Sequence, residues 1–439
     1  MQQCSQLTEK KIEKAFLSNA SAMMLWDGLW AIGMPFCMYA TVVPVYMLHL
    51  GASKTLTQIV VVGFSVITFV QFLTDPLMRN RLRKIWIFLT WILFSLCWFI
   101  YGGSALLFWE KLPLSFWIPF FVLICALLCS ARHYGTPSLR GVVIENIPLT
   151  KRGLLASMRS FLLGLGGLLG TYLVARVMQG QDSVVMFHKV FFIGSVIFVV
   201  ACIPFLVLFK DHAIEEPSAQ KIGPSLWESG KLVWQEPNFR HFLILYCLLF
   251  AAQNMAPLLL SFSKDELHLK AQMVVGFNTV YFVSALILGS TIPNLADRFG
   301  FKILAIISAL MLLTSFAIPL FTHAGMYWLF FSYFLYSGSF QLTQLLLGNF
   351  GTELVPDVKP TTIIVIGSTL VMPLSLIVAP LGGSLADHFG RIGYYYVFVF
   401  ASLLSLVSVL GFIFWVKEPR HQKGISIAPN LVEEKLKES

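Results

Sequence analysis

Long apolar runs alternate with short polar segments over most of the chain. The runs form two groups of six, and the polar stretch 210–239 separates the groups. Each run reaches or nearly reaches the ~20 residues that an α-helix needs to cross the ~30 Å hydrocarbon core of a bilayer. Helices are favoured because lipid offers no partner to free backbone N–H and C=O groups. The runs span 20–48, 55–76, 85–107, 115–143, 153–178 and 187–209, then 240–262, 271–293, 303–322, 327–349, 361–382 and 392–416.

This pattern predicts an all-α integral membrane protein with 12 transmembrane helices, arranged as two pseudo-symmetric six-helix bundles. Composition agrees, because 57% hydrophobic residues, 12% charged residues and a mean hydropathy of +0.77 are far from the averages of soluble domains. We expect the bundles at 1–209 and 240–420, a cytoplasmic central loop with an amphipathic helix at 210–239, and a cytoplasmic tail at 421–439.

The net charge of +9 is explained by topology. Most of the 31 Lys and Arg residues lie at the termini, in the central loop and in alternate connections, so the positive-inside rule puts both termini in the cytoplasm, with the plasma membrane as the expected location. Nucleic acid is therefore not an expected partner. The seven cysteines lie mostly inside apolar runs and suggest neither a disulfide framework nor a metal site.

Two loops on the cation-rich side occupy equivalent places in the two halves. After the second run, Asp75 is followed by cations that begin at Arg79, and after the eighth run Asp297 and Arg298 stand together. A carboxylate at such a helix end can cap a neighbouring helix and pair with a cation across the gap between bundles. A third stretch, 383–391, has Gly383 four positions before Asp387, but it follows the eleventh run and is expected on the outer face.

These loops resemble the signature of the major facilitator superfamily, Gly-x-x-x-Asp-Arg-x-Gly-Arg-Arg. The first copy is degenerate, and the second has Phe301 in place of an Arg. The acidic–Pro–basic turns at 145–153 and 353–360 are similar to turns of the same family, so the resemblance covers essentially the whole chain. It implies two bundles that rock about a shared midplane site. The residues expected at a cytoplasmic gate are Asp75, Arg79, Glu145, Arg152, Asp297 and Arg298.

Charged side chains inside the predicted spans need an explanation, because one at a helix centre costs about 2.5–3.5 kcal/mol on insertion scales. Arg132 and His133 lie near the middle of the fourth span, roughly 20 Å from Glu145 at 1.5 Å per residue. Asp27 is a carboxylate well inside the first span. The resemblance implies that spans one, four, seven and ten line the cavity. Asp27 and His133 are then candidates for proton coupling, and Arg132 for binding an anionic group.

A structural role for these charges stays open at this point. Asp27 neutralises Arg132 or Arg140 if the helices pack closely, since charges inside membranes usually pair. Arg159, near the cytoplasmic end of the fifth span, is expected to have a structural partner as well. The partners expected for Arg159 are Glu145 and Asp75.

The second half carries neutral polar side chains where the first half carries charge. Span ten has Ser337, Gln341 and Gln344 at helical spacing, and span seven has two amides before Pro257. Any one such amide bonds to a neighbouring helix about as often as to a ligand. The row on span ten favours a wet cavity, because lipid would leave it unsatisfied. The residues expected to bind substrate are Trp30, Met34, Arg132, His133, Thr136, Gln253, Asn254, Asn278, Tyr281, Tyr333, Ser337, Gln341 and Gln344.

The sequence therefore predicts a secondary active transporter that moves a small organic solute, anionic or zwitterionic, by alternating access. Proton coupling is favoured over sodium coupling, because a carboxylate and a histidine can titrate and no cage of oxygen ligands is evident. A multidrug or metabolite exporter of the same fold and a non-transporting sensor or lipid-handling protein are the alternatives. An enzyme is least favoured, since no nucleophile–base cluster or phosphate-binding glycine loop is found. We expect a monomer without cofactor or metal, whose partners are lipid, the solute and protons.

Overall fold

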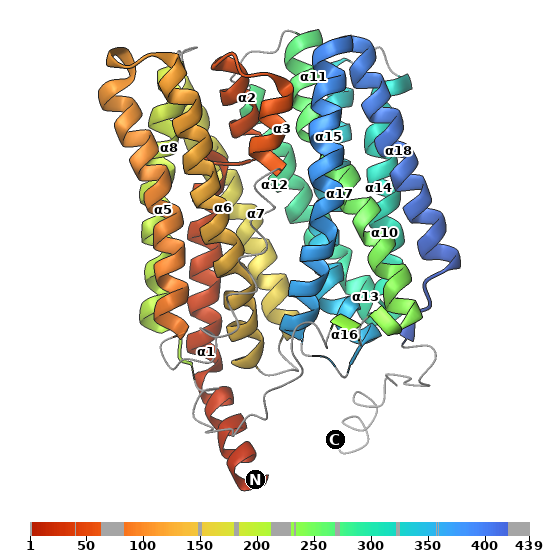
Figure 1. The fold of residues 1–439 in the computed structure, drawn as a ribbon. Helices are drawn as coiled ribbons and strands as arrows, with labels where there is room; N and C mark the ends of the chain where they lie inside the picture. Colours follow the sequence, from red (N-terminus) through yellow and green to blue (C-terminus); the bar gives the residue numbers. More distant parts are fainter. Residues whose placement is uncertain are drawn as a thin grey trace.

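The protein, as a computed structural model, is helical throughout its described part (Figure 1). The structure describes residues 2–39, 41–62, 83–147, 152–179, 184–211, 230–231, 234–267, 273–321, 325–356, 358 and 360–419.

The first half of the chain forms the bundle on the left of Figure 1. Its described helices are α1 (Gln2–Gly33), α2 (Val42–His49), α3 (Lys54–Val62), α5 (Arg83–Phe108), α6 (Leu114–Glu145), α7 (Arg152–Met178) and α8 (Val184–Leu208). Within it, α1 packs against α7 and α8, and α5 packs against α6 and α8.

The second half repeats these neighbour relations. Its described helices are α10 (Pro237–Gln253), α11 (Pro257–Leu267), α12 (Met273–Thr291), α13 (Pro293–Phe299), α14 (Phe301–Phe321), α15 (Met326–Leu345), α16 (Gly351–Leu354), α17 (Pro360–Phe389) and α18 (Arg391–Phe414). Here α10 packs against α17 and α18, and α14 packs against α15 and α18, as their counterparts do in the first half. The predicted pair of pseudo-symmetric bundles is confirmed.

The same amide clasp closes each half. In the first half, Asn19 Nδ2 donates to the Lys210 carbonyl at 2.9 Å, and the Lys210 N–H donates to Asn19 Oδ1 at 2.7 Å. In the second half, Asn238 and Lys417 make the same two bonds, both at 2.8 Å. Each clasp ties the first helix of a half to the segment after its last helix, and it satisfies backbone groups that the helix end leaves free.

The described helices have the length and surface of membrane spans. Among the described residues, eight helical stretches are long and apolar enough to cross a bilayer, and Val275–Thr291 is a shorter apolar stretch. On α5, Leu89, Leu93, Leu96 and Ile100 follow helical spacing and are 42–52% exposed. An apolar stripe of this kind is stable in contact with lipid and unfavourable in water. The chain is therefore an integral membrane protein.

Two predicted spans are broken helices. The run 20–48 consists of α1, the 3₁₀ turn Met34–Phe36 and α2, and the run 240–262 is divided between α10 and α11. Pro35 and Pro257 stand at the breaks, where proline removes a backbone donor and its ring clashes with the preceding turn. Each of these two predicted spans is therefore a pair of helices joined by a turn, although Pro237–Asp265 still has the length and hydropathy of one membrane span.

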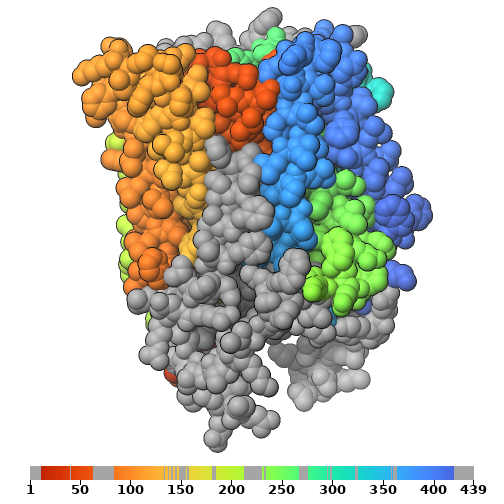
Figure 2. Space-filling view, in the orientation of Figure 1, coloured from red at the N-terminus to blue at the C-terminus, as the bar shows by residue number. Residues whose placement is uncertain are grey.

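The halves meet through two helix pairs related by the pseudo-symmetry, α7 with α12 and α3 with α17. A Cβ added to Gly167 on α7 would lie 2.0 Å from the ring of Phe282 on α12, so only glycine allows this approach. Figure 2 shows the described part of α3 wedged between α6 and α17 at the end opposite the N-terminus.

Candidate substrate site

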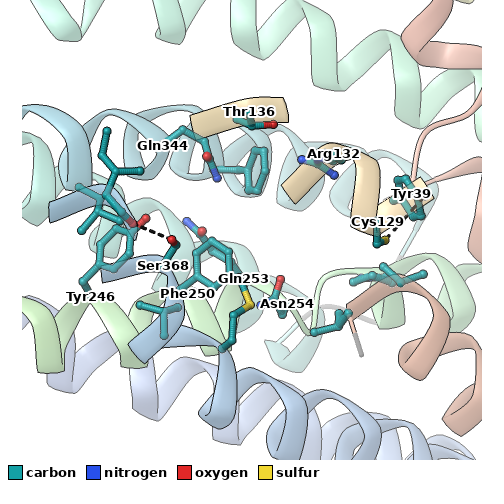
Figure 3. A pocket seen from close by; sticks show the side chains of 18 of the residues that line it. Tyr39, Cys129, Arg132, Thr136, Tyr246, Phe250, Gln253, Asn254, Gln344 and Ser368 are labelled. Atoms are coloured by element: carbon teal, nitrogen blue, oxygen red, sulfur yellow. Dashed lines mark hydrogen bonds between the residues drawn. The ribbon is translucent and has the colours of Figure 1, made fainter. Parts of the chain in front are cut away.

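A cavity of about 230 Å³ lies between the two halves (Figure 3). Its walls come from α3 and α6 of the first half and from α10, α15 and α17 of the second. The volume lies just below the ~300–1,000 Å³ typical of sites for drug-sized ligands, so it suits a small solute. The described residues that line it are Tyr39, Val61, Val62, Cys129, Arg132, Thr136, Tyr246, Phe250, Gln253, Asn254, Pro257, Tyr336, Phe340, Gln344, Leu347, Ile364, Ser368, Val371 and Met372.

Each wall of the cavity is one face of a helix. On α6 the lining residues are Cys129, Arg132 and Thr136, which are three and four positions apart and therefore share a side. The same spacing recurs in Tyr246, Phe250 and Gln253 on α10, in Tyr336, Phe340 and Gln344 on α15, and in Ile364, Ser368 and Val371 on α17.

Arg132 alone is charged among the described residues that line the cavity. It lies roughly 20 Å along α6 from Glu145, close to the middle of this helix. Its side chain is exposed, and within the described part of the chain it makes no ion pair or hydrogen bond. Among the described residues, the site therefore offers one cation without an ion pair, close to the middle of α6.

Asp27 pairs with Arg159, which corrects the predicted pairing. Arg159 on α7 donates through Nε to Asp27 Oδ2 and through Nη2 to Oδ1 at 3.3 Å. The reason is helix packing, since α1 lies against α7. Cβ atoms added to Gly166 and Gly170, on the same face of α7 as Arg159, would meet carbonyls of α1 at 2.4 and 2.1 Å. Among the described side chains, Asp27 is paired with Arg159 and not with Arg132. The side chains of Arg140 and Glu145, and Asp75 as a whole, lie outside what the structure describes.

Gln253 and Asn254 stand at the break between α10 and α11, and both line the cavity. Gln253 Nε2 donates to Ser339 Oγ at 3.0 Å and to Thr343 Oγ1 at 2.7 Å. Ser308 extends this network, with Oγ 2.8 Å from Thr343 Oγ1. The polar network fixes the Gln253 amide from the side of α15 and leaves its Oε1 buried, without a hydrogen-bond partner among the described residues.

Three predicted substrate-binding residues of the second half bond elsewhere. Asn278 on α12 accepts a hydrogen bond from Thr41 and donates to the Pro35 carbonyl at 3.2 Å, so it joins the two halves. Gln341 Nε2 donates to the Tyr281 hydroxyl at 2.9 Å. These side chains lie beside the cavity wall and are absent from the described residues that line it.

The remaining predicted residues outside the lining serve packing. The Ser337 hydroxyl donates to the Tyr333 carbonyl at 2.7 Å, and Tyr333 is fully buried. Trp30 stacks on Trp26 with ring centroids 5.7 Å apart, and Met34 packs against the hydrophobic core. The wall of α15 is thus the face next to the one predicted, with Gln344 common to both.

The other predicted residues lie outside what the structure describes. Asp75 and Arg79 belong to the undescribed segment 63–82. For other residues that the sequence singles out, the structure describes the backbone but not the side chain. These residues are His133, Arg140, Glu145, Arg152, Asp297 and Arg298. The cytoplasmic gate and the role of His133 stay predictions.

Several lining residues were not predicted. Tyr246 and Phe250 precede Gln253 at helical spacing, a signal that could have extended the predicted amide site along α10. Ser368 on α17 carried no such signal, because a serine inside a span ordinarily bonds to its own helix. It does so here, donating to the Ile364 carbonyl at 2.6 Å.

A polar contact joins the halves at the end opposite the N-terminus. Asp387, at the end of α17, accepts from the Lys54 and Thr55 N–H groups at 3.0 and 2.9 Å and from the Thr55 hydroxyl at 2.7 Å. The carboxylate thereby caps the N-terminus of α3, where unpaired N–H groups and the helix dipole favour an anion. Lys54 Nζ lies 2.8 Å from Asp265 Oδ2 on α11. A Cβ on Gly383 would meet Thr55 Cα at 2.8 Å, so glycine is needed for the approach.

Comparisons with known proteins identify the fold. Residues 15–380 match the family model of the Major Facilitator Superfamily. A mutant of the nucleoside transporter NupG superposes with a TM-score of 0.66 and 16% identity, over 92% of this chain and 100% of that chain. A D-xylose-proton symporter superposes with a TM-score of 0.65 and 14% identity, over 91% of this chain and 98% of that chain. The xylose transporter XylE from E. coli superposes with a TM-score of 0.62 and 14% identity, over 95% of this chain and 99% of that chain. That structure is in a partially occluded inward-open conformation. No curated protein matches the sequence.

Proposed function

Because the chain belongs to the Major Facilitator Superfamily, we propose that it is a secondary active transporter that moves a small organic anion or zwitterion by alternating access. The observation that carries the proposal is Arg132, a cation in the cavity between the halves with no ion pair among described residues. A cation at this depth is costly unless an anion accompanies it. A carboxylate or phosphate on the solute supplies that anion through charge-assisted hydrogen bonds.

We propose further that transport is coupled to protons through Asp27. Protonation of this carboxylate removes its attraction for Arg159. Arg159 lies on α7, the helix that contacts α12 across the interface between halves at Gly167. Loss of the ion pair is therefore expected to alter the packing of α7 against α1 and α12. The fold accommodates proton coupling, since one structural relative is described as a proton symporter.

The charge distribution orients the protein in the membrane. The positive-inside rule supports cytoplasmic termini, so the contact between α3 and α17 faces outward. In this orientation the cavity is closed from outside by that contact.

Arg132→Met is expected to abolish binding of organic acids, because it removes the cation and retains an unbranched side chain. A melting-temperature screen of the purified protein against organic acids identifies the strongest ligand, and titration of that ligand measures affinity. Loss of at least about 100-fold is expected for a charge-assisted pair inside the cavity. The matched control is Arg176→Met, which removes an exposed cation bonded to Tyr172 near the end of α7. Affinity unchanged in Arg132→Met would remove this residue from the site.

Asp27→Asn is expected to eliminate the response of transport to a pH gradient. In proteoliposomes the wild type should take up the screened acid faster when an inward proton gradient is imposed, and the variant should not. The amide cannot titrate but keeps the size of the carboxyl group. Glu110→Gln, which neutralises an exposed carboxylate on the loop after α5, should behave as the wild type. A variant that still follows the gradient would rule out coupling through Asp27.

A further inference from the structure

The break between α10 and α11 presents two consecutive amides to the cavity. α10 ends at Gln253, Asn254 begins the turn, and Pro257 starts α11. Figure 3 shows the two side chains across the cavity from Arg132 and Thr136. Both residues therefore belong to the wall of the same cavity as Arg132.

Gln253 offers an acceptor. Its Nε2 is used by Ser339 and Thr343, and the Thr343 hydroxyl donates its own hydrogen to the Ser339 carbonyl at 2.9 Å. Thr343 Oγ1 is therefore free to accept the amide hydrogen, which fixes the orientation of the Gln253 amide. Oε1 is left buried with no hydrogen-bond partner among described residues, on a side chain that is only 1% exposed.

Asn254 offers the complementary group. Its Nδ2 is a buried donor that has no partner within the described part of the chain. A buried polar group that is left without a hydrogen bond destabilises the protein. Adjacent residues thus present one unmet acceptor and one unmet donor, and whatever occupies the cavity gains free energy by satisfying both.

Aromatic rings on two helices restrict the shape of that occupant. Tyr246 and Phe250 of α10 and Tyr336 and Phe340 of α15 line the same cavity. Flat aromatic walls favour a planar group between them. An amide is planar and holds an N–H donor beside a carbonyl acceptor. This donor–acceptor pair is similar to the N6–H and N7 edge of adenine, which Asn and Gln side chains recognise.

We infer that the solute is a small organic acid that also carries an amide edge, as in a primary carboxamide, a lactam or an imide. Its N–H donates to Gln253 Oε1, its carbonyl accepts from Asn254 Nδ2, and its carboxylate binds Arg132. This inference rests on the proposed function and adds the chemical class of the solute. It assigns Gln253 and Asn254 as the residues that determine specificity.

Matched probes of equal size test the assignment. Succinamate has a carboxylate and a primary amide, and 4-methylpentanoate has the same carboxylate with two methyl groups in place of the amide oxygen and nitrogen. Titration calorimetry of the purified full-length protein should show succinamate binding at least about tenfold more tightly, the value of one hydrogen bond to an otherwise unpaired buried group. Equal affinities, tighter binding of 4-methylpentanoate, or no binding of either acid at millimolar concentration would overturn the inference.

Single substitutions test whether Gln253 and Asn254 are responsible for the preference for succinamate over 4-methylpentanoate. Asn254→Leu and Gln253→Met replace each amide by an apolar group of similar size, so each should reduce the succinamate preference to about a third or less of its wild-type value, while 4-methylpentanoate still binds. Thr279→Val is the control, since the exposed Thr279 hydroxyl bonds only to its own helix, at the Val275 carbonyl. An undiminished preference in both variants would contradict the assignment, and the wild-type comparison stands alone if a variant fails to fold.

Arg132→Met separates this inference from the proposed function. If both acids bind the wild type with equal affinity and neither binds Arg132→Met, the anion site is supported and the amide site is contradicted. If Arg132→Met retains both acids, the proposed function falls together with the inference.

Discussion

The intramembrane charges of the first half have different roles because they have different neighbours. Asp27 is 14% exposed and is held by two donors of Arg159, whereas Arg132 reaches into the cavity without a described partner. The sequence reveals all three charges, since each interrupts an apolar run. Their pairing depends on which helix faces which, and Gly166 and Gly170 decide it by letting α7 approach α1.

Arg159→Met is expected to lower stability by up to about 3 kcal/mol, because it leaves the Asp27 carboxylate desolvated without its partner. The double variant Asp27→Asn, Arg159→Met should recover most of this loss, since it leaves no unpaired charge. Melting temperatures in detergent, taken for the wild type, both single variants and the double variant, measure the coupling. Additive losses would show that the two side chains do not stabilise the protein as a pair.

At the end opposite the N-terminus, the helix pair α3 and α17 joins the two halves of the molecule. Asp387 caps α3 across the boundary between halves, and Lys54 pairs with Asp265 beside it. The sequence contains the Gly383 to Asp387 string and predicts that it lies on the outer face, but it does not predict the contact with α3. Its function depends on the N-terminus of a helix from the other half, which no local pattern encodes.

Asp387→Asn should shift the population toward states open on the outer face. The variant keeps one acceptor oxygen but loses the charge that the N-terminus of α3 favours, so a shift of about three- to tenfold in the ratio of states is expected. Electron-spin distance measurements between labels on the outer ends of α5 and α18 report this ratio. Glu110→Gln removes a carboxylate at the same end outside the contact, and it should leave the distances unchanged. An identical distance distribution in Asp387→Asn would show that the carboxylate does not hold this end closed.

The apolar runs predicted the two bundles and the order of their described helices, whereas the breaks within two of the runs were not predicted. Pro35 and Pro257 lie at breaks, yet Pro204 and Pro319 lie inside continuous helices. A proline alone therefore does not determine whether a helix is broken. Packing between helices determines whether the freed backbone groups find other partners. The amide clasps that close both halves are likewise invisible in sequence, because each joins residues about 180 to 190 positions apart.

The candidate site was predictable where a polar residue interrupts an apolar run, as at Arg132, Thr136, Gln253, Asn254 and Gln344. Walls made of ordinary membrane residues, such as Phe250 or Val371, carry no such mark. The rotation of α15 about its axis also could not be read from spacing, since Ser337 and Tyr336 both continue by helical steps to Gln344. Only the packed bundle selects the face that meets the cavity.

Alternating access requires one cavity that is reached from each side of the membrane in turn. Ser368→Cys places a thiol in the wall of that cavity, and a membrane-impermeant maleimide can be applied to either face of oriented proteoliposomes. We expect labelling above the wild-type background from both faces, with the outer rate raised in the Asp387→Asn background. Labelling from one face only, unaffected by Asp387→Asn, would contradict alternating access through this cavity.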